Sequence, residues 1–342
     1  MAADALPSTV DELPTPSLVV DLDVLEANCA AMDAVRPGRS LRPHVKAFKS
    51  TALARHLEQD GHPAFCAATP REIEGLARAG VGDDLLLANE SLDVARLGTL
   101  AADPSVEATI TVAVDSDAVL DAAIGGGVRS VLIDIDVGLP RCGCDVETGE
   151  RLAHRARSVG LEVRGVMGYE GHLMMVADRA EQRIAVEASM QLLADAHAQV
   201  GGEIVSAGGT GTFDLHDATG ITELQAGSYA LMDTHYGQQG LPFEQALFVI
   251  GTVISVNDKW SVADVGLKSL GMDHGDPTVI GGKVWFCSDE HLTYRPDEPA
   301  TVGDRTRVIP AHVDPTMAIH DTAWIVRDDE VIDRWPIDLR GW

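Results

Sequence analysis

The chain has 342 residues, 45% of them hydrophobic, which suffices for one or two folded domains and argues against a disordered polymer. Its 53 acidic and 26 basic residues give a formal charge of −27, which argues against nucleic acid or an anionic membrane surface as a partner. Because there is no secretion signal, no pair of CxxC motifs and no apolar run of the roughly 18 residues that span a membrane, we expect a cytoplasmic protein with reduced thiols.

From about residue 17 to residue 245, short β-branched runs alternate with alanine-rich segments of helical periodicity. The predicted strands are 17–22, 40–46, 64–68, 84–89, 108–114, 128–136, 161–168, 203–208 and 222–227. Repeated β-α units predict a parallel sheet covered by helices. This many strands favours a closed (β/α)8 barrel over a doubly wound sheet, and no early GxGxxG motif supports the latter.

After about residue 245 the pattern changes to successive strands joined by Gly, Pro and Asp turns, with no convincing helix. We therefore predict an α/β protein with an N-terminal (β/α)8 TIM-like barrel over residues 17–245. A mainly β domain would follow over residues 246–342, and residues 1–22 are a candidate extra strand of that domain.

The segment RPHVKAFK, residues 42–49, ends the second predicted strand. A lysine at the C-terminal end of a barrel strand can form a Schiff base with a carbonyl compound, and burial beside cationic neighbours lowers its pKa enough to make it nucleophilic. Taken alone, the segment is more typical of a solvated basic turn, because most lysines are exposed.

Two glycine-bearing segments follow later strands, SAGGTGT at 206–212 and LQAGS at 224–228. Such loops present backbone N–H groups and hydroxyls to phosphate, although each by itself also fits a plain turn between strand and helix. The second loop falls where barrels commonly bind phosphate. Two such loops together with a lysine indicate pyridoxal phosphate.

The segment PAHVDP, residues 310–315, contains a candidate metal site. If the segment is extended, residues i and i+2 point to the same side, which would place His312 and Asp314 about 7 Å apart along the strand. An imidazole and a carboxylate can bind a divalent cation, and the alternative is a strand end with a satisfied histidine. The nearby SDEH run, residues 288–291, is either a further polar wall or a turn.

Several segments, in this order, resemble the D-threonine aldolase and D-serine dehydratase family, and metal-activated D-threonine aldolases most of all. They are LPTPSLVVDLDVLEAN, RPHVKAFK, DVGLPRCG, GYEGHLM, GGTGT, LQAGSYALMD, SDEH and PAHVDP. The family consists of fold type III pyridoxal-phosphate enzymes with an alanine-racemase-like barrel and β domain. The likeness covers nearly the whole chain. It departs at Ala47-Phe48, where the family usually has Thr-His, so any hydrogen bond from those side chains to the cofactor pocket is missing or replaced.

The resemblance implies that Lys46 holds pyridoxal phosphate covalently and is catalytic, together with the metal ligands His312 and Asp314. Arg141 would lie near the phenolic oxygen of the cofactor or near the substrate carboxylate. The other implied cofactor residues are Tyr169 and His172 at the ring, Gln225 at the pyridine nitrogen, and Thr210, Gly211, Gly227 and Ser228 at the phosphate.

The metal pair distinguishes the two main branches of the family. The dehydratases use His-x-Cys, whose thiolate suits zinc, whereas the carboxylate of Asp314 suits manganese or magnesium, with zinc a further option. We therefore expect an aldolase, a carbon–carbon lyase that cleaves a D-3-hydroxy amino acid such as D-threonine to glycine and an aldehyde. A dehydratase of D-serine or D-3-hydroxyaspartate is the alternative. A non-catalytic pyridoxal phosphate carrier is more remote, since carriers lack a β domain. Relatives pair head to tail, so we expect a homodimer.

Overall fold

The computed structural model describes residues 6–341; residues 1–5 and 342, which the predicted domains include, lie outside the described residues. Its contacts divide the chain into two compact units, which are described separately. The barrel unit consists of residues 32–46, 53–227 and 339–341, and the β unit of residues 6–31, 47–52 and 228–338. Within the described residues no helix combines the length and apolar character needed to cross a membrane.

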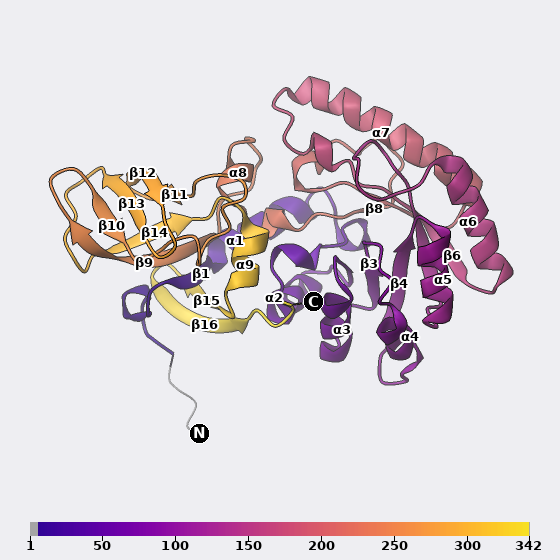
Figure 1. The fold of residues 1–342 in the computed structure, drawn as a ribbon, viewed down its shortest axis with the longest axis horizontal. Helices are drawn as coiled ribbons and strands as arrows, with labels where there is room; N and C mark the ends of the chain where they lie inside the picture. The colour runs from indigo at the N-terminus through magenta and orange to yellow at the C-terminus, as the bar shows by residue number, and fades with distance from the viewer. Residues whose placement is uncertain (1–5, 342) are drawn as a thin grey trace. The chain divides into compact units, whose positions relative to one another are not determined.

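The barrel unit is built on a seven-stranded parallel sheet in chain order (Figure 1). Its strands are β2 (Ala64–Ala67), β3 (Asp84–Leu87), β4 (Thr109–Val114), β5 (Ser130–Asp134), β6 (Glu162–Met167), β7 (Ile204–Ala207) and β8 (Glu223–Leu224). These strands confirm the predicted TIM-like architecture. A buried apolar layer runs across them, with one residue each from six neighbouring strands, Cys66, Leu86, Ala113, Leu132, Met167 and Ile204.

The predicted strand 40–46 forms only isolated bridges. Leu41 bridges Leu224 of β8, and His44 bridges Cys66 of β2, so this segment joins the two edge strands of the sheet. Pro43 carries no N–H for a ladder, and 3-10 turns flank the segment at Gly38–Ser40 and Val45–Ala47. The prediction of a regular strand was therefore wrong here, although the segment takes the expected position.

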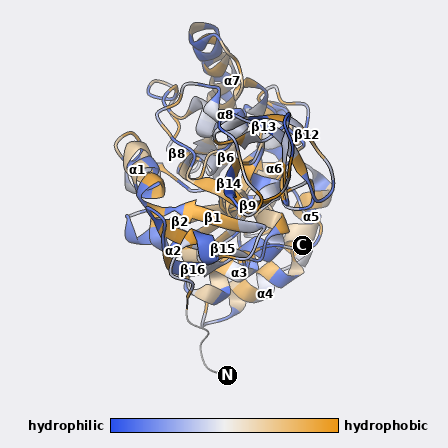
Figure 2. Ribbon diagram, turned by 90° about the vertical axis from the view of Figure 1, so that its left-hand side faces the viewer, coloured by the Kyte–Doolittle hydropathy of each residue, from blue (hydrophilic) through white to orange (hydrophobic). Residues whose placement is uncertain are grey.

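Helices follow the strands of the barrel unit and lie on the outside of its sheet (Figure 1). They are α3 (Pro70–Ala79), α4 (Ala95–Ala102), α5 (Asp117–Gly125), α6 (Val146–Ser158) and α7 (Arg179–Val200), and α2 (Thr51–Gln59) begins in the β unit. Helix α3 shows why such a segment becomes helical: Thr69 and Glu72 form a capping box at its start, and Gly80 ends it in the left-handed conformation. In Figure 2, α7 carries both hydrophobic and hydrophilic segments, as expected for a helix with one buried face.

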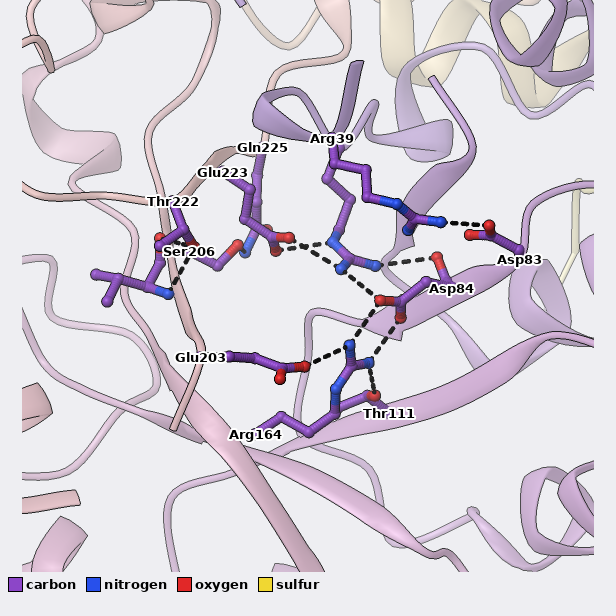
Figure 3. A network of polar contacts seen from close by, with 12 residues as sticks. Arg39, Asp83, Asp84, Thr111, Arg164, Glu203, Ser206, Thr222, Glu223 and Gln225 are labelled. Atoms are coloured by element: carbon purple, nitrogen blue, oxygen red, sulfur yellow. Dashed lines mark hydrogen bonds and ion pairs between the residues drawn. The ribbon is translucent and has the colours of Figure 1, made fainter. Parts of the chain in front are cut away.

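A network of buried charges joins the N-terminal ends of the barrel strands (Figure 3). Arg42 donates to both oxygens of Glu223 at 2.7 and 2.9 Å and to Asp84 Oδ2 at 3.1 Å. Arg164 of β6 donates to the two oxygens of Asp84 at 2.8 and 2.7 Å. Active sites of such barrels lie at the C-terminal ends of the strands, which is the opposite end of the sheet. We therefore assign this network to the stability of the barrel.

The β unit contains a nine-stranded sheet whose main path is β12-β13-β10-β9-β1-β15-β16. Its strands are β1 (Ser17–Asp21), β9 (Leu247–Val256), β10 (Ser261–Ala263), β11 (Thr278–Val279), β12 (Gly282–Cys287), β13 (Leu292–Pro296), β14 (Arg305–Ile309), β15 (Thr322–Arg327) and β16 (Glu330–Pro336). The N-terminal strand β1 pairs antiparallel with β9 and parallel with β15, so it belongs to this sheet.

The β unit also contains helical segments. They are α8 (Thr234–Gly237), α9 (Val313–Ile319) and most of α1 (Leu22–Asp33). The sequence indicated no helix after residue 245, and α9 shows that this was wrong. Pro315 lies in the first turn of α9, where proline is tolerated because the N–H it lacks has no partner within the helix.

Candidate active site

Three of the predicted cofactor residues meet at one aromatic ring in the barrel unit. Lys46 Nζ lies 5.7 Å, and Arg141 Cζ 5.2 Å, from the centroid of the Tyr169 ring. These residues follow the segment 41–44, β5 and β6, so all three lie at C-terminal ends of the barrel elements. The half-buried amine of Lys46 thus has an aromatic face and a guanidinium close by.

His172 belongs to the short 3-10 helix Gly171–Leu173 and is exposed. Gly138 lies against its ring and has a positive φ of 115°. A Cβ at Gly138 would come within 3.1 Å of His172 Cε1, so glycine is required for this close approach. The structure therefore places His172 beside the loop that carries Arg141.

The glycine-rich loop after β7 lies next to the same aromatic ring. A Cβ on Gly209 would come within 3.3 Å of Tyr169 Cε2, and a Cβ on Gly211 within 2.3 Å of the carbonyl oxygen of Met174. Thr210 and Gly211 are both buried and begin the 3-10 helix Thr210–Thr212. Glycine at these positions lets the loop backbone approach its neighbours where any side chain would collide.

The next strand end carries the remaining predicted cofactor residues. Gln225 donates its side-chain amide to Ser206 Oγ at 2.8 Å, while its N–H donates to Ala207 O at 3.0 Å. Gly227 is buried and ends the barrel unit, whereas Ser228 is buried in the β unit and begins the 3-10 helix Ser228–Ala230.

The predicted metal ligands face each other, but for a different reason from the expected one. The expectation of an extended segment over residues 310–315 was wrong, because His312 is the N-cap of α9 and Asp314 lies in the first helical turn. His312 Nε2 is nevertheless 3.6 Å from Asp314 Oδ2. Burial alone would lower the pKa of His312, but hydrogen bonds and charges from Asp314 and Asp273 raise it above its ordinary value.

The structure adds two residues to this cluster that the sequence did not indicate. Asp273 Oδ2 lies 2.7 Å from His312 Nδ1, and the ring of His274 stacks on that of His312 at 3.9 Å between centroids. Asp273, His274 and His312 each offer a ligand atom within 4.8 Å of the others. The sequence signal for these two residues is the run MDHGD in the loop between β10 and β11, where an acidic residue and a histidine are adjacent.

Buried Asp233 holds the turn on which the predicted metal ligands lie. Its carboxylate accepts from the N–H of Val313 at 2.9 Å and from the N–H of Tyr236 at 2.8 Å. Burial raises the pKa of Asp233 despite these two hydrogen bonds. The N–H between His312 and Asp314 in the chain is thereby fixed, which restricts the directions of both side chains.

The segment 288–291 lies outside this cluster. Ser288 N donates to His291 O at 2.8 Å, which closes a turn between β12 and β13. Asp289 and Glu290 form ion pairs with Lys268, and all three side chains are more than half exposed. The segment SDEH is therefore better described as a turn than as a polar wall of the predicted metal site.

At the departure from the family pattern, Ala47 and Phe48 are both wholly buried. Apolar side chains donate no hydrogen bonds, so these positions contribute packing where the family usually has polar groups. The residues that do converge fit pyridoxal phosphate: an amine can bind its aldehyde, an aromatic ring can lie along its pyridine, and a close-packed glycine loop can receive its phosphate.

Two protein families match this chain. The family described as alanine racemase, N-terminal domain, matches residues 20–235, and the family described as putative serine dehydratase domain matches residues 246–326. The first match covers most of the chain and ends close to the point where the mainly β sequence begins.

Two relatives that match over nearly the full length are named as aldolases. A 3-hydroxy-D-aspartate aldolase from Paracoccus denitrificans is 35% identical over 363 residues, and a D-threonine aldolase from Arthrobacter sp. is 36% identical over 355 residues. Each alignment covers 96% of this chain and 93% of the relative. The crystal structure of D-threonine aldolase from Filomicrobium marinum superposes with a TM-score of 0.91 at 30% identity, covering 100% of this chain and 99% of that one. The chain therefore belongs to the alanine-racemase-like family of D-threonine aldolases and D-serine dehydratases.

Proposed function

We propose that this chain is a pyridoxal-phosphate- and divalent-metal-dependent aldolase that cleaves D-3-hydroxy amino acids to glycine and an aldehyde. The observation that carries the proposal is the meeting of Lys46 and Arg141 at the ring of Tyr169, in a chain whose relatives of 35 and 36% identity are aldolases. The match of residues 246–326 to a dehydratase domain argues against a carrier that consists of the barrel alone.

In this proposal each residue has a defined task. Lys46 provides the amine that holds the cofactor, and the guanidinium of Arg141, which keeps its charge at any physiological pH, binds a carboxylate or phenolate oxygen. Tyr169 limits the space over the ring. Thr210 and Gly211 hold the phosphate. When bound, pyridoxal phosphate supplies an electron sink for the pair of electrons left on Cα when the Cα–Cβ bond breaks.

The reaction balances without an oxidant. The β-hydroxyl loses its proton, the Cα–Cβ bond breaks, an aldehyde leaves and Cα takes up a proton to give glycine. His312 and Asp314 would hold a divalent cation, which supplies Lewis acidity toward the β-hydroxyl. The second carboxylate, Asp273, lies 2.7 Å from His312 Nδ1 and supports a hard cation such as manganese or magnesium, while a neighbouring imidazole such as His274 also suits zinc.

The test combines substrate, cofactor and metal. Purified protein with pyridoxal phosphate and manganese should convert D-threonine to acetaldehyde and glycine, and D-3-hydroxyaspartate to glyoxylate and glycine, and a chelator should abolish both. An Asp314→Ala variant should lose this chelator-sensitive activity. An Asp258→Asn variant, altered at an exposed turn residue of the same unit, should keep it.

Other products would decide against the proposal. If D-threonine gave 2-oxobutyrate and ammonia, the chain would be a dehydratase and the argument from Asp314 would be wrong. If the cofactor bound but neither substrate changed its absorbance, a carrier role would replace catalysis.

We also propose, from the family resemblance, a homodimer in the cytoplasm. Light scattering coupled to size-exclusion chromatography should give twice the mass of the 36.3 kDa chain. A monomeric mass at assay concentrations would contradict this.

A further inference from the structure

A buried charge network lies behind the glycine-rich loop of the barrel unit. Glu170 follows β6 and His216 follows the loop, and both side chains are 0% exposed. His216 Nε2 lies 3.2 Å from Glu170 Oε1, and the Thr212 hydroxyl donates to the same oxygen at 2.7 Å. The N–H of Gly208 donates to Glu170 Oε2 at 3.2 Å. A single carboxylate from one strand end thus binds both ends of the loop at the next strand end.

Each ring nitrogen of His216 has a hydrogen-bonding partner. The hydroxyl of Thr219 donates to His216 O at 3.1 Å, so its oxygen is left to accept from His216 Nδ1 at 3.3 Å. Nε2 faces Glu170, and an ionised carboxylate only accepts. Burial alone would raise the pKa of Glu170, but hydrogen bonds from His216 and Thr212 lower it below its ordinary value. The buried Glu170 carboxylate is therefore enclosed by three hydrogen-bonding partners, the N–H of Gly208, the hydroxyl of Thr212 and the ring of His216.

The loop is shaped around this pair. Gly208 has a φ of 86°, and a Cβ there would come within 3.0 Å of His216 Nε2, so only glycine lets the imidazole reach Glu170. On another side, Arg179 of α7 donates to Gly211 O at 2.7 Å. Contacts from α7 and from Glu170 thus fix the loop at the backbone of Gly208 and Gly211 and at the side chain of Thr212.

We propose that Glu170 and His216 are positioning residues for the phosphate of the cofactor. They hold Gly208 and Thr212, and thereby aim the loop between them at the phosphate. This inference rests on the proposed function. It predicts that disturbing the pair weakens binding of pyridoxal phosphate but not of pyridoxal, which has the same ring and aldehyde without the phosphate.

The experiment measures the affinities of the purified full chain for pyridoxal phosphate and for pyridoxal by equilibrium dialysis. Glu170→Gln replaces one acceptor oxygen with an amide nitrogen that only donates, so it disturbs the contacts of this side chain with Gly208, Thr212 and His216. Loss of a hydrogen bond to a charged group is worth about tenfold or more in an equilibrium constant. We expect the affinity for pyridoxal phosphate to fall by at least about tenfold, with the affinity for pyridoxal unchanged.

A milder variant and a matched control keep the test decisive. Thr212→Val removes the hydroxyl that donates to Glu170 Oε1 and accepts from the N–H of Gly209, but it keeps the Glu170 and His216 side chains. It should lower the affinity for pyridoxal phosphate relative to pyridoxal by a smaller factor, even if Glu170→Gln fails to fold. Arg164→Met disturbs a buried charge network of the same unit at the N-terminal strand ends, and it should leave the ratio unchanged.

The outcomes separate the two proposals. Equal changes in both affinities, or no change, in Glu170→Gln and Thr212→Val would overturn the positioning role while the proposed function stood. Failure of the unaltered chain to bind pyridoxal phosphate would refute the proposed function and this inference with it.

Discussion

Replacing Asp84 with asparagine should destabilise the barrel unit by about 2 kcal/mol or more. Burial alone would raise the pKa of this side chain, but hydrogen bonds from Arg164 and the charge of Arg42 lower it from 3.8 to about 2. Each unit of pKa is worth about 1.4 kcal/mol, and the side chain is only 10% exposed, so solvent screens the interaction weakly. The loss could approach about 5 kcal/mol, because two buried guanidinium groups would lose their shared carboxylate.

The contribution of Asp84 to the free energy of unfolding should decrease as the pH falls. Because the folded-state pKa of Asp84 is lowered, its contribution is fully present above pH 3.8 and is lost as the pH falls through about 2. The difference in unfolding free energy between the parent chain and Asp84→Asn should therefore be largest near neutral pH and shrink within that acidic range.

The assay can follow the two units separately. Helices α3 to α7 lie in the barrel unit, so far-ultraviolet circular dichroism during denaturation mainly reports that unit. Four of the five tryptophans, Trp260, Trp285, Trp324 and Trp335, lie in the β unit, whose unfolding their fluorescence reports. Asp84→Asn should shift the first signal more than the second.

The neighbouring residue is the control. Asp83 also pairs with an arginine, Arg39, but both side chains are more than half exposed. Asp83→Asn should therefore cost less than about 1 kcal/mol. Equal losses in the two variants, or an Asp84→Asn difference that stays constant down to pH 2, would refute the argument that burial makes this network stabilising.

Two further variants test the candidate site. Gly211→Ala should lower the free energy of unfolding by about 1 to 3 kcal/mol and weaken pyridoxal phosphate binding, since its Cβ would come within 2.3 Å of Met174 O. The control is Gly125→Ala, whose Cβ would meet nothing within 4 Å, so its stability should be unchanged or higher and its cofactor binding unchanged. Denaturation measures the stability and dialysis the binding. Asp233→Asn should cost about 1 to 3 kcal/mol in tryptophan-monitored unfolding, because its amide N–H would face the N–H of Val313 or Tyr236; an unchanged midpoint would contradict this.

The fold was predictable where local chemistry and tertiary structure agree. The apolar runs that become β2 to β7 have lengths and flanking helices that admit few arrangements other than parallel strands. Agreement failed at Pro43, where a residue without an N–H sits in an extended run and leaves bridges in place of a strand. The prediction was also wrong at Pro315, because this proline lies in the first turn of a helix and not in an extended segment.

The candidate site was predictable in part. Lys46 and the glycine loops lie at the ends of predicted strands, and barrel topology brings such ends together. Asp273 is 39 residues from His312, and no spacing in a sequence shows that a loop returns to a particular helix. Glu170 stands inside the GYEGH segment, but its role depends on burial and on the approach of His216, which become visible only in three dimensions.

Strand β1 has a consequence for the order of synthesis. Its partners β9 and β15 begin at Leu247 and Thr322, so a nascent chain emerging from the ribosome carries an unpaired apolar strand until the barrel sequence has already been made. The strands β2 to β8 are contiguous in the chain and can pair as they emerge. We therefore expect the barrel to form first. Until β9 and β15 have been synthesised, β1 remains unpaired and accessible to chaperones and to other copies of the chain.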